Sequence, residues 1–123
     1  MNASDEIVLF HNPRCSKSRA ALELLRGRGV EPRIVEYLKT PPTPDELCAV
    51  LEKLQLQPQD IVRKGEDIYK SDYSGRTLGP AEWLAALHEH PILMERPIAV
   101  RGSLAVVGRP PEKVLTLLQD DQD

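Results

Sequence analysis

The sequence contains little cysteine, since only Cys15 and Cys48 among its 123 residues carry a thiol. The two lie far apart along the chain, and neither has a second cysteine or a histidine at the spacing of a zinc site. A chain of this length can bury a core of its own without covalent or metal cross-links. We therefore expect no structural disulfide and no metal ion.

Long apolar runs and an excess of positive charge are lacking as well. No segment approaches the length that spans a bilayer, and residues 1–6 lack the basic start of a secretion signal. The chain has a formal net charge of -3 at pH 7. It would therefore need a local basic patch to bind a nucleic acid, and the composition does not indicate one. These absences predict a soluble, cytoplasmic protein with neither a membrane nor a nucleic acid as partner.

The segment around the first cysteine, residues 11–19, has the sequence HNPRCSKSR. It follows the unbroken apolar run IVLF, which is typical of a central buried strand, and Pro13 marks the loop after that strand. A helix is expected from about Ser16, and the N–H groups and dipole at its start favour a thiolate and attract anions. Local chemistry leaves two readings of Cys15 open: a reactive nucleophile beside an anion site, or a small buried apolar residue.

The first third of the chain predicts a strand, a helix and a second strand. Residues 18–26 have the spacing of an amphipathic helix, and Gly27 and Gly29 can end it. Residues 33–38 then form the next apolar strand. We expect this strand-helix-strand unit to be parallel and right-handed.

A helical block is expected to follow. Residues 43–46, with the sequence TPDE, combine a capping box with a proline at the first helical position. The apolar stripe after them makes Cys48 a predicted packing residue. Pro58 is expected to open a short helix, residues 66–79 to form a loop, and Pro80 to start another helix.

The last third predicts a hairpin and a final helix. Two apolar strands, 97–100 and 104–107, flank a turn, and Arg96-Pro97 is a candidate cis bond. The segment GRPPE at 108–112 leads into the last helix. The order of elements predicts an α/β protein with a small mixed sheet covered by helices.

Four segments, in order along the chain, resemble the glutaredoxin-linked arsenate reductase family, the ArsC family. They are HNPRCSKSR at 11–19, EYLKTPP at 36–42, HPILMERPI at 90–98 and GRPPE at 108–112. The resemblance implies a single thioredoxin-like or glutaredoxin-like domain over residues 1–123. Its four-stranded mixed sheet, flanked by helices, would carry a helical insertion at about 43–90 between a β-α-β half and a β-β-α half.

The resemblance also implies roles for individual residues. Cys15 would be the nucleophile, and three arginines would bind the oxyanion: Arg63, Arg96 and Arg109. Arg96 and Arg109 lie inside the matching segments, whereas Arg63 rests on the looser match IVRK at 61–64. A planar guanidinium suits this role because it offers several donors to a tetrahedral anion and stays charged.

Three further residues of the first segment are expected to support the site. His11 would support the ionised Cys15 or would be a partly exposed loop residue. Ser18 and Arg19 would contact the thiolate or its loop, or would have a structural role alone.

The mechanism implied by the resemblance is the reduction of arsenate. The Cys15 thiolate would attack arsenic, glutathione would follow as co-substrate with no bound cofactor, and glutaredoxin would complete reduction to arsenite. The sequence itself favours an external second thiol, because Ser18 stands three residues after Cys15.

Two other functions stay open. One is a thiol- or glutathione-dependent oxidoreductase of the same fold with another substrate. The other is a non-catalytic protein that binds an oxyanion or acts as a redox regulator, although such regulators typically use a Cys-x-x-Cys pair that Ser18 removes.

Overall fold

The computed structural model describes residues 6–122, which separate into two compact units. One, the sheet unit, combines residues 6–37 with 96–122. The other, the helical unit, runs from Leu38 to Glu95 and encloses the segment 43–90, where the sequence predicts an insertion. Cys15 therefore belongs to the sheet unit and Cys48 to the helical unit.

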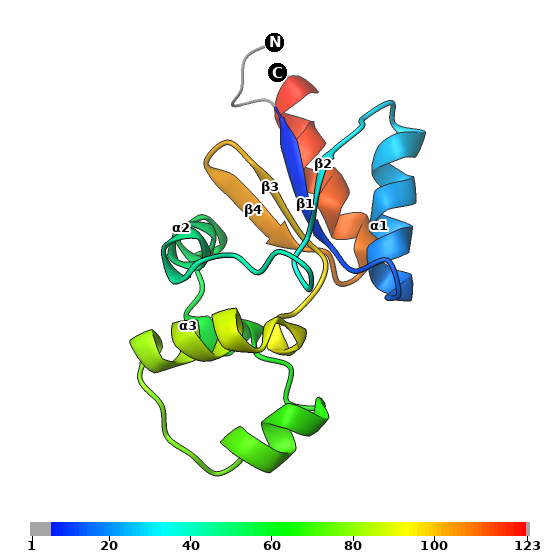
Figure 1. Ribbon diagram of the computed structural model, residues 1–123. Helices are drawn as coiled ribbons and strands as arrows, with labels where there is room; N and C mark the ends of the chain where they lie inside the picture. Colours follow the sequence, from blue (N-terminus) through cyan, green and yellow to red (C-terminus); the bar gives the residue numbers. More distant parts are fainter. Residues whose placement is uncertain (1–5, 123) are drawn as a thin grey trace. The chain divides into compact units, whose positions relative to one another are not determined.

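The sheet unit contains a four-stranded mixed sheet with the order β2-β1-β3-β4 (Figure 1). The central strand β1 (Ile7–His11) pairs in parallel with β2 (Arg33–Glu36) and antiparallel with β3 (Ile98–Arg101). Strand β4 (Leu104–Val107) pairs antiparallel with β3. The predicted mixed sheet is confirmed, although β2 ends two residues earlier than the expected 33–38 because the chain turns after Glu36.

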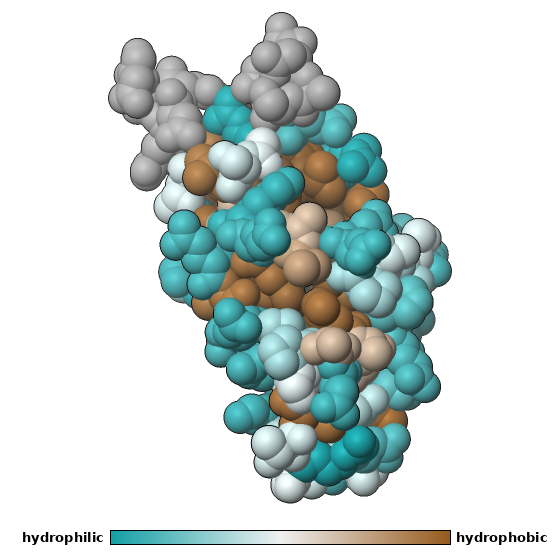
Figure 2. Space-filling view, turned by 90° about the vertical axis from the view of Figure 1, so that its left-hand side faces the viewer, coloured by the Kyte–Doolittle hydropathy of each residue, from teal (hydrophilic) through white to brown (hydrophobic). Residues whose placement is uncertain are grey.

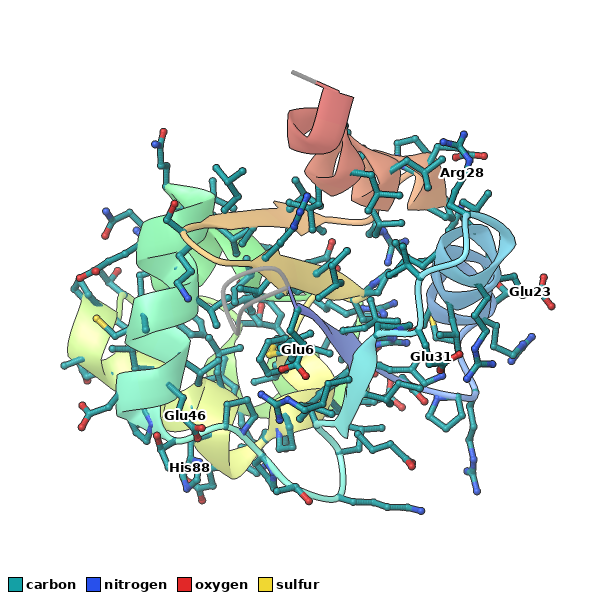
Figure 3. The ribbon with its side chains drawn as sticks, turned by 90° about the horizontal axis from the view of Figure 1, so that it is seen from above. Glu6, Glu23, Arg28, Glu31, Glu46 and His88 are labelled. Carbon is teal, nitrogen blue, oxygen red and sulfur yellow. The ribbon has the colours of Figure 1, made fainter. Side chains whose placement is uncertain are left out.

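Two helices cover one face of this sheet, as Figures 1 and 3 show. They are α1 (Ser16–Gly27) and the 3-10 helix η5 (Pro111–Gln122), which contact each other. Between them and the sheet lies a core that includes the completely buried Leu9, Leu25 and Val114. Each leucine side chain removed from water contributes about 1.5–3 kcal/mol, so this face holds α1 on β1.

The helical unit has two α-helices and three short helical segments. In chain order these are α2 (Pro44–Leu54), η2 (Pro58–Ile61), η3 (Tyr69–Tyr73), α3 (Pro80–Glu89) and η4 (Pro91–Leu93). The capping box predicted for α2 is present, because Thr43 Oγ1 accepts from Glu46 N at 3.1 Å and Glu46 Oε1 accepts from Thr43 N at 2.9 Å. Glu46 lies at the start of this helix in Figure 3.

Two expectations for the helical unit are wrong. The predicted loop 66–79 contains the single π-helical turn η3, because the buried Tyr73 packs on Trp83 with ring centroids 5.7 Å apart. Cys48 is exposed instead of packed, since it lies one position off the apolar stripe of α2 and lines a surface groove with Leu51 and Leu84. The π-helical turn was not predicted because the local sequence is polar. The exposure of Cys48 follows from its angular position on α2.

Apolar surface remains among the polar side chains on the face that Figure 2 shows. The exposed large apolar residues include Ile34 on β2 and Leu104 on β4, the two edge strands, at 36% and 43% exposure. Among residues 6–122, no helix is both long and apolar enough to cross a membrane.

A close approach of two chain segments brings two of the predicted arginines together. Gly108 N donates to Pro97 O at 2.8 Å, and a Cβ on Gly108 would lie 2.8 Å from Pro97 Cγ and 3.0 Å from a Val114 methyl. The next residue, Arg109, donates from Nη1 to the main-chain oxygen of Arg96 at 3.4 Å. The Arg96–Pro97 and Arg109–Pro110 bonds are both cis. A side chain at position 108 would force Pro97 or Val114 to shift, so glycine favours this contact.

We predict that Gly108→Ala destabilises the protein by about 2 kcal/mol, because the added methyl overpacks against Pro97 and Val114. Urea unfolding measures the change. Gly27→Ala is the matched control, since a Cβ there meets nothing within 4 Å. An equal effect of the two substitutions would contradict the packing argument.

Candidate active site

Cys15 stands at the N-terminus of α1. It is the N-cap residue of the helix, with extended backbone angles of φ −94° and ψ 123°. Its main-chain oxygen accepts from Arg19 N at 3.0 Å, the first hydrogen bond of the helix. The thiol is partly exposed and forms no disulfide. The position predicted from the sequence is therefore confirmed, and the alternative of a buried apolar cysteine is wrong.

The surroundings of Cys15 favour its thiolate. Burial raises the pKa of the thiol, but the amides of Ser18 and Lys17 and the guanidinium of Arg96 outweigh burial and bring the pKa below its ordinary value. The backbone amides of Ser18 and Lys17 lie in the first turn of α1, where N–H groups have no acceptor within the helix and can stabilise a negative sulfur. A larger fraction of Cys15 is thus ionised near neutral pH than in an ordinary cysteine.

A buried polar cluster joins the end of β1 to the first turn of α1. Ser18 is completely buried, and its hydroxyl lies 2.6 Å from His11 Nδ1 and accepts from Asn12 N at 3.0 Å. Buried polar groups are costly unless they are hydrogen-bonded, so these contacts hold the strand end and the helix start in one arrangement. The buried Ser18 hydroxyl thus stabilises the conformation of the Cys15 loop.

His11 is the last residue of β1 and is only 6% exposed. The alternative of a partly exposed loop residue is therefore wrong. Burial lowers the pKa of His11, the nearby Glu36 raises it, and Arg26 and Arg19 lower it further, with a net decrease. A neutral ring whose Nδ1 accepts the Ser18 hydroxyl proton fits both the pKa and the contact.

Arg19 braces the same loop from the surface. Its Nη1 donates to the main-chain oxygen of Pro13 at 2.9 Å. The side chain therefore links the first turn of α1 to the start of the loop.

The predicted anion-binding arginines fall in different units. Arg96 and Arg109 belong to the sheet unit, where Arg96 interacts with Cys15 and Arg109 contacts the main chain of Arg96. The structure thus brings these two arginines and the nucleophile together within one unit.

Arg63 belongs to the helical unit, where two carboxylates hold it. Its Nε lies 3.4 Å from Glu66 Oε2 and 3.7 Å from Glu95 Oε1. Its main-chain N donates to Leu93 O at 2.6 Å, and its buried Nη1 has no hydrogen-bond partner among the described residues. A buried donor in this state is suited to an acceptor from outside the chain.

Sequence reasoning missed Asn12, which is 5% exposed and lies between His11 and the loop. Its side-chain Oδ1 accepts from Arg14 N at 3.0 Å, and its main-chain O accepts from Cys15 N at 3.0 Å. The signal was the Asn-Pro dipeptide, which favours a turn closed by the asparagine side chain.

Taken together, the sheet unit presents a partly exposed thiol, a guanidinium beside it and helix amides around it. This arrangement can ionise the thiol and stabilise negative charge on a bound group. Within residues 6–122, no group of three or more His, Cys, Asp or Glu side chains is placed to hold a metal ion.

We predict that Arg96→Gln slows alkylation of Cys15 by iodoacetamide at about pH 6 by about three- to tenfold, because a nearby positive charge is lost. The rate is measured against pH in a Cys48→Ser background, which leaves a single thiol. Arg28→Gln, an exposed arginine on the same unit, is the control and should leave the profile unchanged. An unchanged profile in Arg96→Gln would show that Arg96 does not act on the sulfur.

We also predict a pH-dependent stability that originates at His11. Since its pKa is lower in the folded than in the unfolded chain, its neutral form stabilises the fold above the unfolded value of about 6.5, and stability falls as pH decreases through the folded pKa. Urea unfolding of the parent and of His11→Gln between about pH 5 and pH 7.5 measures the difference. The parent should lose more stability towards pH 5, and parallel profiles would refute this origin.

Comparison with known proteins agrees with the fold. The family model described as "ArsC family" matches residues 10–117. The arsenate reductase of Neisseria meningitidis serogroup A is 44% identical over 92% of this chain and 98% of its own length. The uncharacterized protein YfgD of Escherichia coli is 41% identical over 92% and 97%, respectively.

A solved structure, described as arsenate reductase from Vibrio cholerae, superimposes with a TM-score of 0.87 at 41% identity. It covers 91% of this chain, which in turn covers 97% of it. The α/β architecture is thus the thioredoxin-like architecture of ArsC structures, as the motifs predicted. The chain belongs to the ArsC family.

Proposed function

We propose that this protein is a glutathione- and glutaredoxin-dependent arsenate reductase with Cys15 as its nucleophile. The observation that carries the proposal is the partly exposed Cys15 thiol, whose pKa is lowered by helix amides and Arg96. Relatives named arsenate reductase at 40–44% identity support the choice of substrate.

Binding of the anion comes first. Arsenate is a tetrahedral oxyanion, so guanidinium donors and helix N–H groups suit its oxygens. We assign the guanidinium groups to Arg96, Arg109 and Arg63. The contact of Arg109 with the Arg96 main chain supports the first two. The buried Nη1 of Arg63, which has no hydrogen-bond partner within residues 6–122, supports the third.

The Cys15 thiolate then attacks arsenic(V). A sulfur-arsenic bond forms, an arsenate oxygen leaves as water after taking up protons, and the arginines neutralise the charge on the remaining oxygens. Glutathione displaces a second oxygen as water, which gives a cysteine-arsenic-glutathione species. Neither step changes the oxidation state of arsenic.

Reduction requires one more thiol from outside the chain. Glutaredoxin attacks the glutathione sulfur, a mixed disulfide forms, and the electron pair of the broken sulfur-arsenic bond reduces arsenic(V) to arsenic(III). Water then releases arsenite and restores the Cys15 thiol. Ser18 cannot replace this thiol, because a hydroxyl forms no disulfide; its side chain is instead buried in the cluster with His11 and Asn12. Since the cytoplasm keeps glutathione and glutaredoxin reduced, we propose that compartment for the reaction.

The decisive measurement is arsenate-dependent oxidation of NADPH in the presence of glutathione, glutaredoxin and glutathione reductase. We predict turnover by the parent, loss of turnover to background in Cys15→Ser, and full turnover in Cys48→Ser. The Cys48→Ser variant is the matched control, because it removes the exposed thiol of the helical unit by the same substitution.

Each contrary result has a defined meaning. Turnover that does not depend on arsenate but consumes glutathione disulfides would show that the protein is a general thiol oxidoreductase of the same fold. If arsenate protects Cys15 from alkylation but is not turned over, the protein is an oxyanion-binding protein. Loss of activity in Cys48→Ser would replace external resolution with an internal pair of cysteines.

A further inference from the structure

Asn12 forms hydrogen bonds through three separate groups at the point where β1 meets the Cys15 loop. Its main-chain N donates to Ser18 Oγ, its Oδ1 accepts from Arg14 N and its main-chain O accepts from Cys15 N, each at 3.0 Å. Pro13 follows it, so residues 12–15 form a tight turn closed by both the main chain and the side chain of Asn12.

This turn decides which amides are left for the sulfur and its ligand. The N–H groups of Arg14 and Cys15 are used by Asn12, and that of Arg19 begins the hydrogen bonding of the helix. Between Cys15 and Arg19 lie the first three amides of α1, which have no acceptor within the helix. Two of them, from Lys17 and Ser18, act on the Cys15 sulfur.

The side chain of Asn12 supplies one hydrogen bond of the turn that the main chain cannot supply. Any residue but proline at position 12 could keep the main-chain contacts with Ser18 and Cys15, but Arg14 N needs the Oδ1 acceptor. Without it, that part-buried N–H loses its partner and the turn can open towards water. Opening would move Cys15 relative to the helix amides and Arg96.

We propose that Asn12 is a positioning residue for the nucleophile: its side-chain carbonyl holds the 12–15 turn so that the Cys15 sulfur stays beside the amides of Lys17 and Ser18. Asn12 acts through the turn rather than by touching the sulfur. The inference deepens the proposed function and rests on it for the role of the thiol in turnover.

Neutrality is the second requirement at this position. An aspartate would offer the same acceptor, but its negative charge close to the sulfur would disfavour the thiolate. A serine offers a shorter, neutral acceptor that can close a similar turn. The three substitutions to alanine, serine and aspartate therefore separate loss of the acceptor from gain of a charge.

The test follows iodoacetamide alkylation of Cys15 against pH in the Cys48→Ser background. Asn12→Ala should slow alkylation at about pH 6 by about fivefold, the effect expected from one lost hydrogen bond. Asn12→Ser should recover most of the rate, and Asn12→Asp should stay slow. Ser71→Ala, which removes an exposed side-chain hydrogen bond in the helical unit, is the control and should match the parent.

A parent-like profile in Asn12→Ala, or failure of serine to recover the rate, would overturn the proposal. If Asn12→Ala fails to fold, Asn12→Ser and Asn12→Asp are compared instead. Equal alkylation profiles for these two variants would show that position 12 does not act on the sulfur, and would overturn the proposal. In the arsenate assay, Asn12→Ala should lower kcat more than it raises the KM for arsenate. Because alkylation needs no arsenate, a wrong substrate would leave the alkylation pattern intact.

Discussion

The hydrogen bonds of the buried Ser18 hydroxyl connect the two elements on which the thiol site is built. Through His11 and Asn12 they join the end of β1 to the first turn of α1, and the Cys15 loop spans the short distance between these anchors. Ala21 and Leu25, in later turns of α1, pack in the core and hold the rest of the helix on the sheet. The N-terminus of α1 is therefore held from both sides, and with it the dipole and amides that stabilise the thiolate.

Charge around the nucleophile comes from segments remote in sequence. Arg96 and Arg109 lie before β3 and after β4, and the contact between Gly108 and Pro97 gathers them at one place. His11 is not expected to add a positive charge, because burial lowers its pKa and favours the neutral ring. The ionisation of Cys15 thus depends on Arg96 and on oriented amides, while His11 serves as an acceptor for Ser18.

Local sequence signals predicted those elements whose causes are themselves local. The capping box at 43–46 marked the start of α2, and the apolar run before His11 marked the central strand. The π-helical turn at Tyr69–Tyr73 was hidden, because its stability comes from packing on Trp83, which lies ten residues further along the chain. The exposure of Cys48 likewise depends on what α2 packs against, which the periodicity of α2 leaves open.

The sequence by itself determined the strand, the turn and the helix that place Cys15 at an N-terminus, since Pro13, Ser16 and the apolar periods act over a few residues. It also determined that no second thiol follows at the usual spacing. Only the tertiary structure decided that His11 is buried with a lowered pKa, that Asn12 accepts hydrogen bonds from the Arg14 and Cys15 amides, and that Arg96 reaches the sulfur. Burial, hydrogen-bond partners and distances between remote segments arise from packing, which no local pattern specifies.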